Sequence, residues 1–454
     1  MPDSTKNIRC TENITPDSLT GAIFALEGIR DACVILNGPT GCKFYHSAIS
    51  DGQFLRSLSF DPSEDSGRFH FGQPRVPSTY LDGHDYVFGS GEKLSELLRF
   101  AAERRYGLIA VVNSPGAALI GDDLERFVAQ EVRDIPCLSL ENTGYSGTCG
   151  IGYQNALMKV LEVLPPSKSM ASPNPATPPK AESSGGHKKY DRTVNLLGMG
   201  IYQKYYDGNV EAIRRLFALC GVEVLAAPGT GDGMDTLRKS VRVRRNVVIY
   251  PEYGERIAKR YQALYGVQYI LSPEGPPIGF DATEALVRAV CEELDADSRP
   301  AIEAVERARG QAYMNLARYS SLLGLPKGAR FSVKAESSVA NALTRWLCSY
   351  LGMIPAAISL LDDRHVIAAS RLETFLESIG YSDVLNAPIL STPTDIIFAD
   401  GSTISQARLS EAAVCGVEIA LPSLAYLDIV PKTIFGEQGS LYILEQLMNG
   451  LRFI

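Results

Sequence analysis

The chain has 454 residues, of which 45% are hydrophobic and 21% charged, and a formal net charge of −8. This length predicts two to four domains, and the composition is typical of a soluble globular protein. The negative charge argues against a general nucleic-acid binder, because neutralising phosphates requires clustered Lys and Arg. No apolar run approaches the roughly 20 residues that span a bilayer, and the first residues lack the layout of a signal peptide. We therefore expect a cytoplasmic protein without membrane contact.

Apolar runs alternate with helical patterns from one end of the chain to the other. The helical patterns repeat at i, i+3, i+4 and i+7, as at Ile213, Leu216, Phe217 and Cys220. Most apolar runs are continuous, which is typical of parallel strands covered on both faces. Repeated βα units of this kind predict an α/β fold of doubly wound, Rossmann-like domains with mainly parallel sheets. The predicted strands are 32–36, 85–89, 108–113, 137–141, 193–198, 246–250, 268–272, 330–335, 355–361 and 395–399.

One segment, 165–189, is rich in Pro, Ser, Gly and Ala and has almost nothing to bury. Such a composition predicts a flexible linker between domains. A second boundary is predicted near 322–329, where a long helical pattern ends and a new βα series starts. The sequence therefore predicts three α/β domains, at 1–164, about 190–325 and about 326–454.

A single cysteine, Cys42, lies in the stretch LNGPTGCKFY, in a tight turn just past a predicted strand. The turn lacks the GxxxxGK[ST] spacing of a phosphate-binding P-loop, and no other stretch supplies it. His46 lies four residues further on, so a Cys–His nucleophile pair is conceivable, but no third orienting group is evident. A metal ligand is the remaining interpretation of Cys42.

Two further cysteines lie outside the apolar patterns. Cys10 falls in a polar segment and Cys149 in a Gly-rich turn after a predicted strand. Loop thiolates hold iron–sulfur clusters in such settings, although scattered structural thiols explain the pattern equally well. Since a cluster usually takes about four ligands, two or three per chain would indicate sharing across a subunit interface. The other cysteines fit apolar strands and helices and are predicted to be structural: Cys33, Cys137, Cys220, Cys291, Cys348 and Cys415.

Motifs along nearly the whole chain resemble component 1 of the nitrogenase superfamily. Cys10 and the NGPTGC turn resemble the first two cluster cysteines of that family, and LIGDDL (119–124) resembles its IGDD signature. The segments 141–157, 328–353 and 435–451 resemble a loop, a strand–helix unit and the closing helix of the same family. The resemblance implies the same fold and a role in electron transfer.

The chain departs from the family pattern at several positions, and these positions limit which cluster ligands and which cofactor we expect. Pro115 stands where the family has its third cysteine, and Cys149 is a candidate substitute, or else only a small loop residue. Asp17 lies closer than Cys10 to the usual spacing, and a carboxylate ligand has precedent in the superfamily. Tyr250 replaces the cysteine that anchors the iron–molybdenum cofactor, and the cofactor histidine is missing from 418–428. The chain therefore does not resemble a nitrogen-fixing catalytic subunit.

The resemblance implies one subunit of a nitrogenase-like oxidoreductase. Cys10, Cys42 and Cys149 would hold an iron–sulfur cluster, 4Fe–4S or P-cluster-like, at the interface with a homologous subunit in a dimer or tetramer. An ATP-dependent 4Fe–4S iron protein would deliver electrons, and a small-molecule substrate would bind between the domains. Two alternatives are a scaffold subunit for metallocofactor assembly and a cluster-free interaction module.

Overall fold

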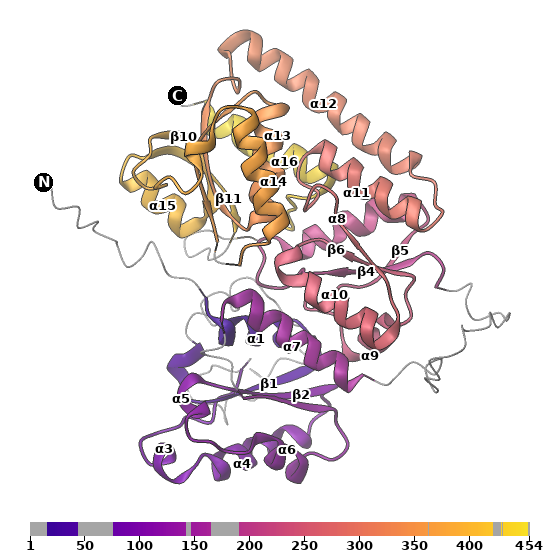
Figure 1. The fold of residues 1–454 in the computed structure, drawn as a ribbon, viewed down its shortest axis with the longest axis vertical. Coiled ribbons are helices and arrows are strands. Elements are labelled where there is room, and N and C mark those ends of the chain that lie inside the picture. The colour runs from indigo at the N-terminus through magenta and orange to yellow at the C-terminus, as the bar shows by residue number, and fades with distance from the viewer. Residues whose placement is uncertain are drawn as a thin grey trace, which may run out of the picture.

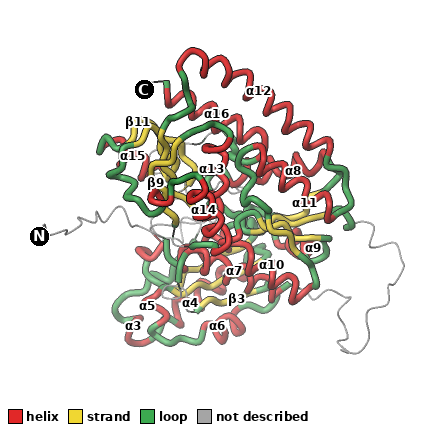
Figure 2. The backbone as a smooth tube through the Cα atoms, turned by 45° about the horizontal axis from the view of Figure 1, so that its top comes forward, coloured by secondary structure: helices red, strands yellow, loops and turns green. Residues whose placement is uncertain are grey.

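A computed structural model describes residues 16–43, 76–141, 147–164, 190–361, 363–420, 428 and 430–452. It contains three parallel sheets, each flanked by helices (Figures 1 and 2). This confirms the predicted fold class of α/β units with parallel sheets. Within the described ranges, no helix combines the length and the apolar character needed to cross a membrane. The predicted linker 165–189 lies outside the described residues, so the domain limits stay a prediction.

The N-terminal sheet has the order β1-β2-β3, with all pairs parallel. Side chains alternate between its faces along each strand. Val34 packs in the core beneath α1 and α7, whereas Ile35 packs with Leu94 and Leu98 of α4 on the opposite face (Figure 1). The elements of this part are α1 Ser18–Glu27, β1 Ala32–Asn37, η2 Thr40–Lys43, α3 Asp85–Phe88, α4 Gly91–Ala102, β2 Leu108–Asn113, α5 Pro115–Ala118, α6 Leu124–Glu131, β3 Cys137–Leu140 and α7 Cys149–Val163.

The middle sheet has the order β5-β4-β6-β7 and is also parallel. Its helix α10 packs against α7, which joins the middle part to the N-terminal part. The elements are β4 Thr193–Leu197, α8 Tyr206–Leu219, β5 Glu223–Ala226, α9 Met234–Ser240, β6 Arg245–Val248, α10 Pro251–Tyr265, β7 Tyr269–Leu271, α11 Phe280–Glu293 and the long helix α12 Arg299–Leu323.

The C-terminal sheet has the order β11-β10-β8-β9. Its last helix, α16, packs on α8, α11 and α12 and so ties this part to the middle one (Figure 1). Residues that follow strands of the middle sheet and of the C-terminal sheet line one small cavity. The elements are β8 Arg330–Ala335, α13 Ser337–Ser349, β9 Ile354–Leu360, α14 Val366–Ser378, η8 Ser382–Val384, β10 Thr394–Asp400, α15 Gly401–Leu409, β11 Ala413–Ala420 and α16 Gly436–Leu451.

One predicted strand is wrong, and two strands were missed. The run 85–89 forms the short helix α3, because the Asp82 side chain accepts the backbone N–H groups of His84 and Asp85 and starts a helical turn. Its apolar residues are exposed rather than buried. The missed strands are β5, which lies at a sheet edge, and β11, in which Cys415 itself lies.

Candidate functional site

The first candidate site is the turn that carries Cys42. Strand β1 ends at Asn37, and the single 3₁₀ turn η2 follows, with the Cys42 N–H donating to the Pro39 carbonyl at 3.1 Å. Gly38 is required here, because a Cβ would lie 2.5 Å from the Cβ of Ser114 at the end of the neighbouring strand. Cys42 thus lies at the carboxyl edge of the sheet, where ligands bind in parallel α/β folds.

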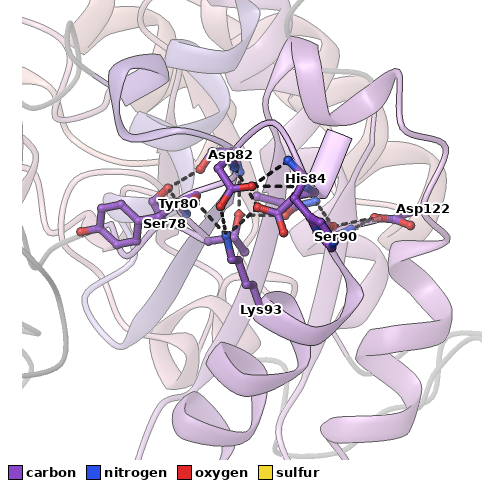
Figure 3. Close-up of polar contacts among 11 residues, drawn as sticks. Ser78, Tyr80, Asp82, His84, Ser90, Lys93 and Asp122 are labelled. Atoms are coloured by element: carbon purple, nitrogen blue, oxygen red, sulfur yellow. Dashed lines mark hydrogen bonds and ion pairs between the residues drawn. The ribbon is translucent and has the colours of Figure 1, made fainter. Parts of the chain in front are cut away.

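A buried polar network fixes the residues under this turn. The Asn37 amide donates to Asn113 Oδ1 at 2.8 Å and to Ser90 Oγ at 3.1 Å, and its oxygen accepts from Thr79 Oγ1 at 3.0 Å. Ser90 in turn donates through its N–H and its hydroxyl to Asp122, at 2.7 and 2.6 Å (Figure 3). Asp122 belongs to the IGDD motif, so this motif supports the Cys42 turn through Ser90 and Asn37.

A second set of contacts holds the loop beside the turn. Lys93 pairs with Asp85 at 2.6 Å and with Asp82 at 3.2 Å, and it donates to the Tyr80 carbonyl (Figure 3). Hydrogen bonds from the His84 N–H and from Lys93 lower the pKa of Asp82. Ser78 donates to the Gly38 carbonyl, which connects this loop to the turn. The turn is therefore held from two sides.

The environment of Cys42 favours the neutral thiol in the chain alone. Burial raises the pKa of Cys42, a hydrogen bond with Ser114 opposes this rise, and the Asp17 carboxylate adds to it. The side chain is half-buried and packs against the main core. A bound cation reverses such preferences, because a coordinating thiol loses its proton. Within the chain alone, Cys42 is therefore a half-buried thiol that keeps its proton.

Cys149 is buried, although its Gly-rich surroundings in the sequence predicted a turn. It is the first residue of α7 rather than a loop residue, and it is 3% exposed. Burial raises the pKa of Cys149 well above its ordinary value, and the carboxylates of Asp363 and Asp17 add to the rise. Asp17 caps α1 through Thr20 and forms a β-bridge with Thr148. Asp17 therefore acts electrostatically on both thiols.

The donors do not form a complete metal site on their own. Within the described ranges, no group of three or more His, Cys, Asp or Glu residues is arranged to hold a metal ion. Pro115 begins α5 and offers no ligand atom. Cys10 lies outside the described residues. Of the two described thiols that Asp17 affects, Cys42 is half-buried and Cys149 is buried.

The second candidate site is a small cavity between the middle and C-terminal sheets. Its volume is about 10 Å³, which is the room that about one water molecule needs. Strand ends from both sheets line it, which is the usual ligand position in such folds. The lining residues are Tyr202, Gln203, Lys204, Tyr250, Glu336, Leu361, Ile419 and Ala420.

Tyr250 occupies the wall of this cavity. It is 2% exposed, and its ring packs 5.7 Å from that of Phe435 and 6.4 Å from that of Tyr253, centroid to centroid. By the resemblance, Tyr250 stands where catalytic nitrogenase subunits have a cofactor cysteine. A phenol enclosed by two aromatic rings supplies no thiolate, so the residues here do not fit an iron–molybdenum cofactor anchored in that way.

Lys204 forms a buried ion cluster behind the cavity. Its side chain is fully buried, contacts Glu418 at 2.7 Å and also pairs with Asp428. Lys432 contacts the same Asp428 at 2.9 Å. Burial opposes ionisation of Asp428, but hydrogen bonds from Lys204 and Lys432 prevail and lower its pKa. The cluster joins the loop after β4 to β11 and so holds the two parts together.

Sequence reasoning named Tyr250 and the segment 418–428 but missed the other residues of this cavity. Lys204 and Glu418 lie far apart in the chain, so no local pattern links them. Glu336 had a usable signal, because it is an acidic residue directly after an apolar strand. Gln203 had none.

Comparisons with known proteins identify the family to which this fold and sequence are similar. Residues 18–452 match the family described as nitrogenase component 1 type oxidoreductase. Component CfbD of the Ni-sirohydrochlorin a,c-diamide reductive cyclase complex of Methanosarcina acetivorans is 27% identical over 150 residues, which are 33% of this chain and 34% of the relative. A light-independent protochlorophyllide reductase chain of Rubrivivax gelatinosus is 27% identical over 239 residues, 52% of this chain and 42% of the relative.

The likeness to these relatives spans between a third and half of their length. A solved structure of nitrogenase Cp1 at pH 6.5 superposes with a TM-score of 0.74 at 16% identity, covering 97% of this chain and 93% of the other. That likeness shows a shared fold. Together with the family match over residues 18–452, it establishes that the chain belongs to the nitrogenase component 1 type oxidoreductase family.

Proposed function

We propose that this chain is one subunit of a nitrogenase-like oxidoreductase and that Cys42 holds an iron–sulfur cluster at the interface with a homologous subunit. The observation that carries the proposal is the position of Cys42, a half-buried thiol at the carboxyl edge of a sheet, on a turn fixed by Asn37, Ser90 and Asp122. When bound, such a cluster supplies one-electron transfer at low potential. That both named relatives are reductases supports the same class of reaction.

The remaining ligands are assigned in the same proposal. Cys10 is the second ligand and Cys149 the third, with Asp17 as the nearest carboxylate alternative. The raised pKa of Cys149 requires the charge of a bound cluster to release its proton. A donor set that is incomplete within the described ranges fits a cluster that the partner subunit completes.

The decisive measurement is iron and labile sulfide per chain after anaerobic purification with the homologous subunit. We expect iron in the wild-type protein and its loss in Cys42→Ser, because a hydroxyl is a poor ligand for this soft-donor site. The matched control is Cys348→Ser, which changes a half-buried thiol in α13 far from the turn and keeps its iron.

Iron that stays in Cys42→Ser contradicts the assignment of this ligand. Iron absent from every protein, including wild type, removes the electron-transfer function altogether. That result would favour the cluster-free interaction module, which the loss of the expected ligand at Pro115 makes worth testing.

An exposed apolar surface beside Cys42 supports a protein partner. Val87 and Phe88 of α3 are 73% and 74% exposed, and Leu119 after α5 is 78% exposed. Tyr86, from the same helix, lies close to Cys42, since burial and then the charge of the Cys42 thiolate raise the pKa of this phenol. We propose that this surface receives the ATP-dependent iron protein, since an electron donor must approach the cluster ligand closely.

We expect Phe88→Ser to lower donor-dependent turnover by about tenfold, because losing about 1.4 kcal/mol of apolar contact has that effect. Iron content and melting temperature should not change. Leu409→Ser is the matched control, since Leu409 is 86% exposed at the end of α15 in the C-terminal part. Equal turnover in the two variants would place the donor elsewhere.

A further inference from the structure

We propose that Glu336 is the acid that supplies protons in the interdomain cavity, acting through one water held by the Gln203 amide. The inference rests on the proposed reductase function, because a substrate that gains electrons one at a time must also gain protons. It adds a named proton source to that function, in a cavity separate from the Cys42 turn.

The position of Glu336 is the first observation. It directly follows β8, is 6% exposed and lines the cavity. Tyr253 donates to its carboxyl group through a long hydrogen bond of 3.4 Å. The other donor described for this carboxyl group is the backbone N–H of Glu336 itself. Among the described residues, Tyr253 is thus its one side-chain donor, and a proton on the carboxyl group can point into the cavity.

Gln203 supplies an independent observation. It is 5% exposed, and its side-chain oxygen accepts the Gly200 N–H at 2.6 Å, which fixes the amide plane. Its Nε2 group is buried and has no hydrogen-bond partner among the described residues. A buried N–H donor without an acceptor is costly. A cavity of about 10 Å³ beside it has room for about one water, which would accept from Gln203 and from Glu336.

The charges around Glu336 suit proton transfer near neutral pH. Burial raises the pKa of Glu336 to about 7, and the charges of Glu252 and Asp363 add to the rise. The Tyr253 hydroxyl and the backbone N–H of Glu336 oppose it. The other ionisable groups near the cavity are Tyr250, Tyr202, the Lys204 cluster and Cys149. A general acid works best when its pKa is near the operating pH.

The neighbouring carboxylate has a different role. Glu252 accepts from Ser337 Oγ at 2.5 Å, from Ser338 N at 2.7 Å and from Ser338 Oγ at 2.8 Å. Its oxygens are committed to the start of α13, and it does not line the cavity. Of these two buried acids, Glu336 is the one placed to give up a proton.

The step balances with one electron from a one-electron donor of the iron–sulfur class. The O–H bond of Glu336 breaks and its proton passes to the water. The water passes one of its own protons to the substrate atom that gains the electron. Glu336 is left as a carboxylate and takes a proton back from solvent before the next electron arrives.

The test compares wild type, Glu336→Gln and Gln203→Leu as the full chain with its partner subunit. Infrared difference spectra recorded across neutral pH follow the protonated carboxyl band. We expect a band that titrates near pH 7, is lost in Glu336→Gln and is kept in the control Glu255→Gln. Glu255 is on α10 and pairs with His365 at 3.1 Å, outside the cavity. A titrating band that persists in Glu336→Gln overturns the proposal.

The kinetic arm measures dihydrogen evolution driven by the iron protein, in which two electrons delivered one at a time and two protons relayed in turn from Glu336 give one dihydrogen molecule. We expect Glu336→Gln to slow it by about 100-fold, the lower range for general acid catalysis, and to abolish the pH dependence near 7, with cluster reduction unchanged. Gln203→Leu should slow it without removing the infrared band. Unchanged rates and pH profile in Glu336→Gln overturn the proposal. Absent iron in wild type instead removes the proposed function, while the infrared result still decides on the carboxyl group.

Discussion

Replacing Lys204 by Met should destabilise the folded chain by about 3–5 kcal/mol, the cost of breaking a buried ion pair. The Lys204 side chain is fully buried, and those of Glu418 and Asp428 are only 3% and 16% exposed. Met has a similar volume but no charge, so two carboxylates remain in a low-dielectric site. Among the described residues, Lys432 is then the one cation left in contact with Asp428. Urea unfolding of wild type and variant measures the difference in the free energy of unfolding.

The control is a triple variant that also removes the two negative charges left by the loss of Lys204. Combining Lys204→Met with Glu418→Gln and Asp428→Asn should recover much of the loss, because a neutral buried group avoids the uncompensated charge. A single variant as stable as wild type, or a triple variant less stable than the single one, would contradict this account.

The pH dependence gives a second check. The pKa of Asp428 is lowered in the folded chain, with burial opposing and the hydrogen bonds from Lys204 and Lys432 prevailing. A lowered folded pKa contributes stability that is present above the unfolded pKa of about 3.9 and is lost as the pH falls through the folded pKa. The difference between wild type and Lys204→Met should therefore shrink in acid.

The strands that sequence patterns located share one physical property. Continuous apolar runs such as those of β1 and β2 are buried along their entire length, so composition alone locates them. The run 85–89 has the same composition, but Val87 and Phe88 lie on the surface, and only the Asp82 contacts that start α3 distinguish it. Strand β11 was missed because its first residues are not all buried.

The two candidate sites also differ in how far a local sequence pattern predicts them. Cys42 was predictable because a turn after an apolar strand is a local signal. The residues that support Cys42 were not predictable, since Asn37 meets Ser90, and Ser90 meets Asp122, only once the loops fold back over the sheet. The interdomain cavity is lined by residues that come from two sheets, such as Gln203 and Glu336, and no local pattern links these residues.

Replacing Gly152 by Ala should be the most damaging conservative change in the N-terminal part, with a loss of about 3 kcal/mol or more. Helices α1 and α7 cross so closely that a Cβ on Gly152 would lie 2.6 Å from the carbonyl carbon of Ser18. At the same crossing, a Cβ on Gly21 would overlap the Cys149 carbonyl. Backbone atoms cannot rotate away as a flexible side chain does, so the helices would have to separate. Thermal unfolding measures the effect.

Gly310→Ala is the matched control, because Gly310 lies within the long helix α12 with nothing within 4 Å of an added Cβ. There the same methyl group should stabilise the chain by about 0.5–1 kcal/mol through helix propensity alone. The crossing also bears on the cluster, since separating α1 from α7 would break the bridge between Asp17 and Thr148 and shift Cys149. If Cys149 is a ligand, folded Gly152→Ala should lose iron as well as stability, whereas normal iron in the folded variant would leave Cys42 and Cys10 as the ligands of this chain.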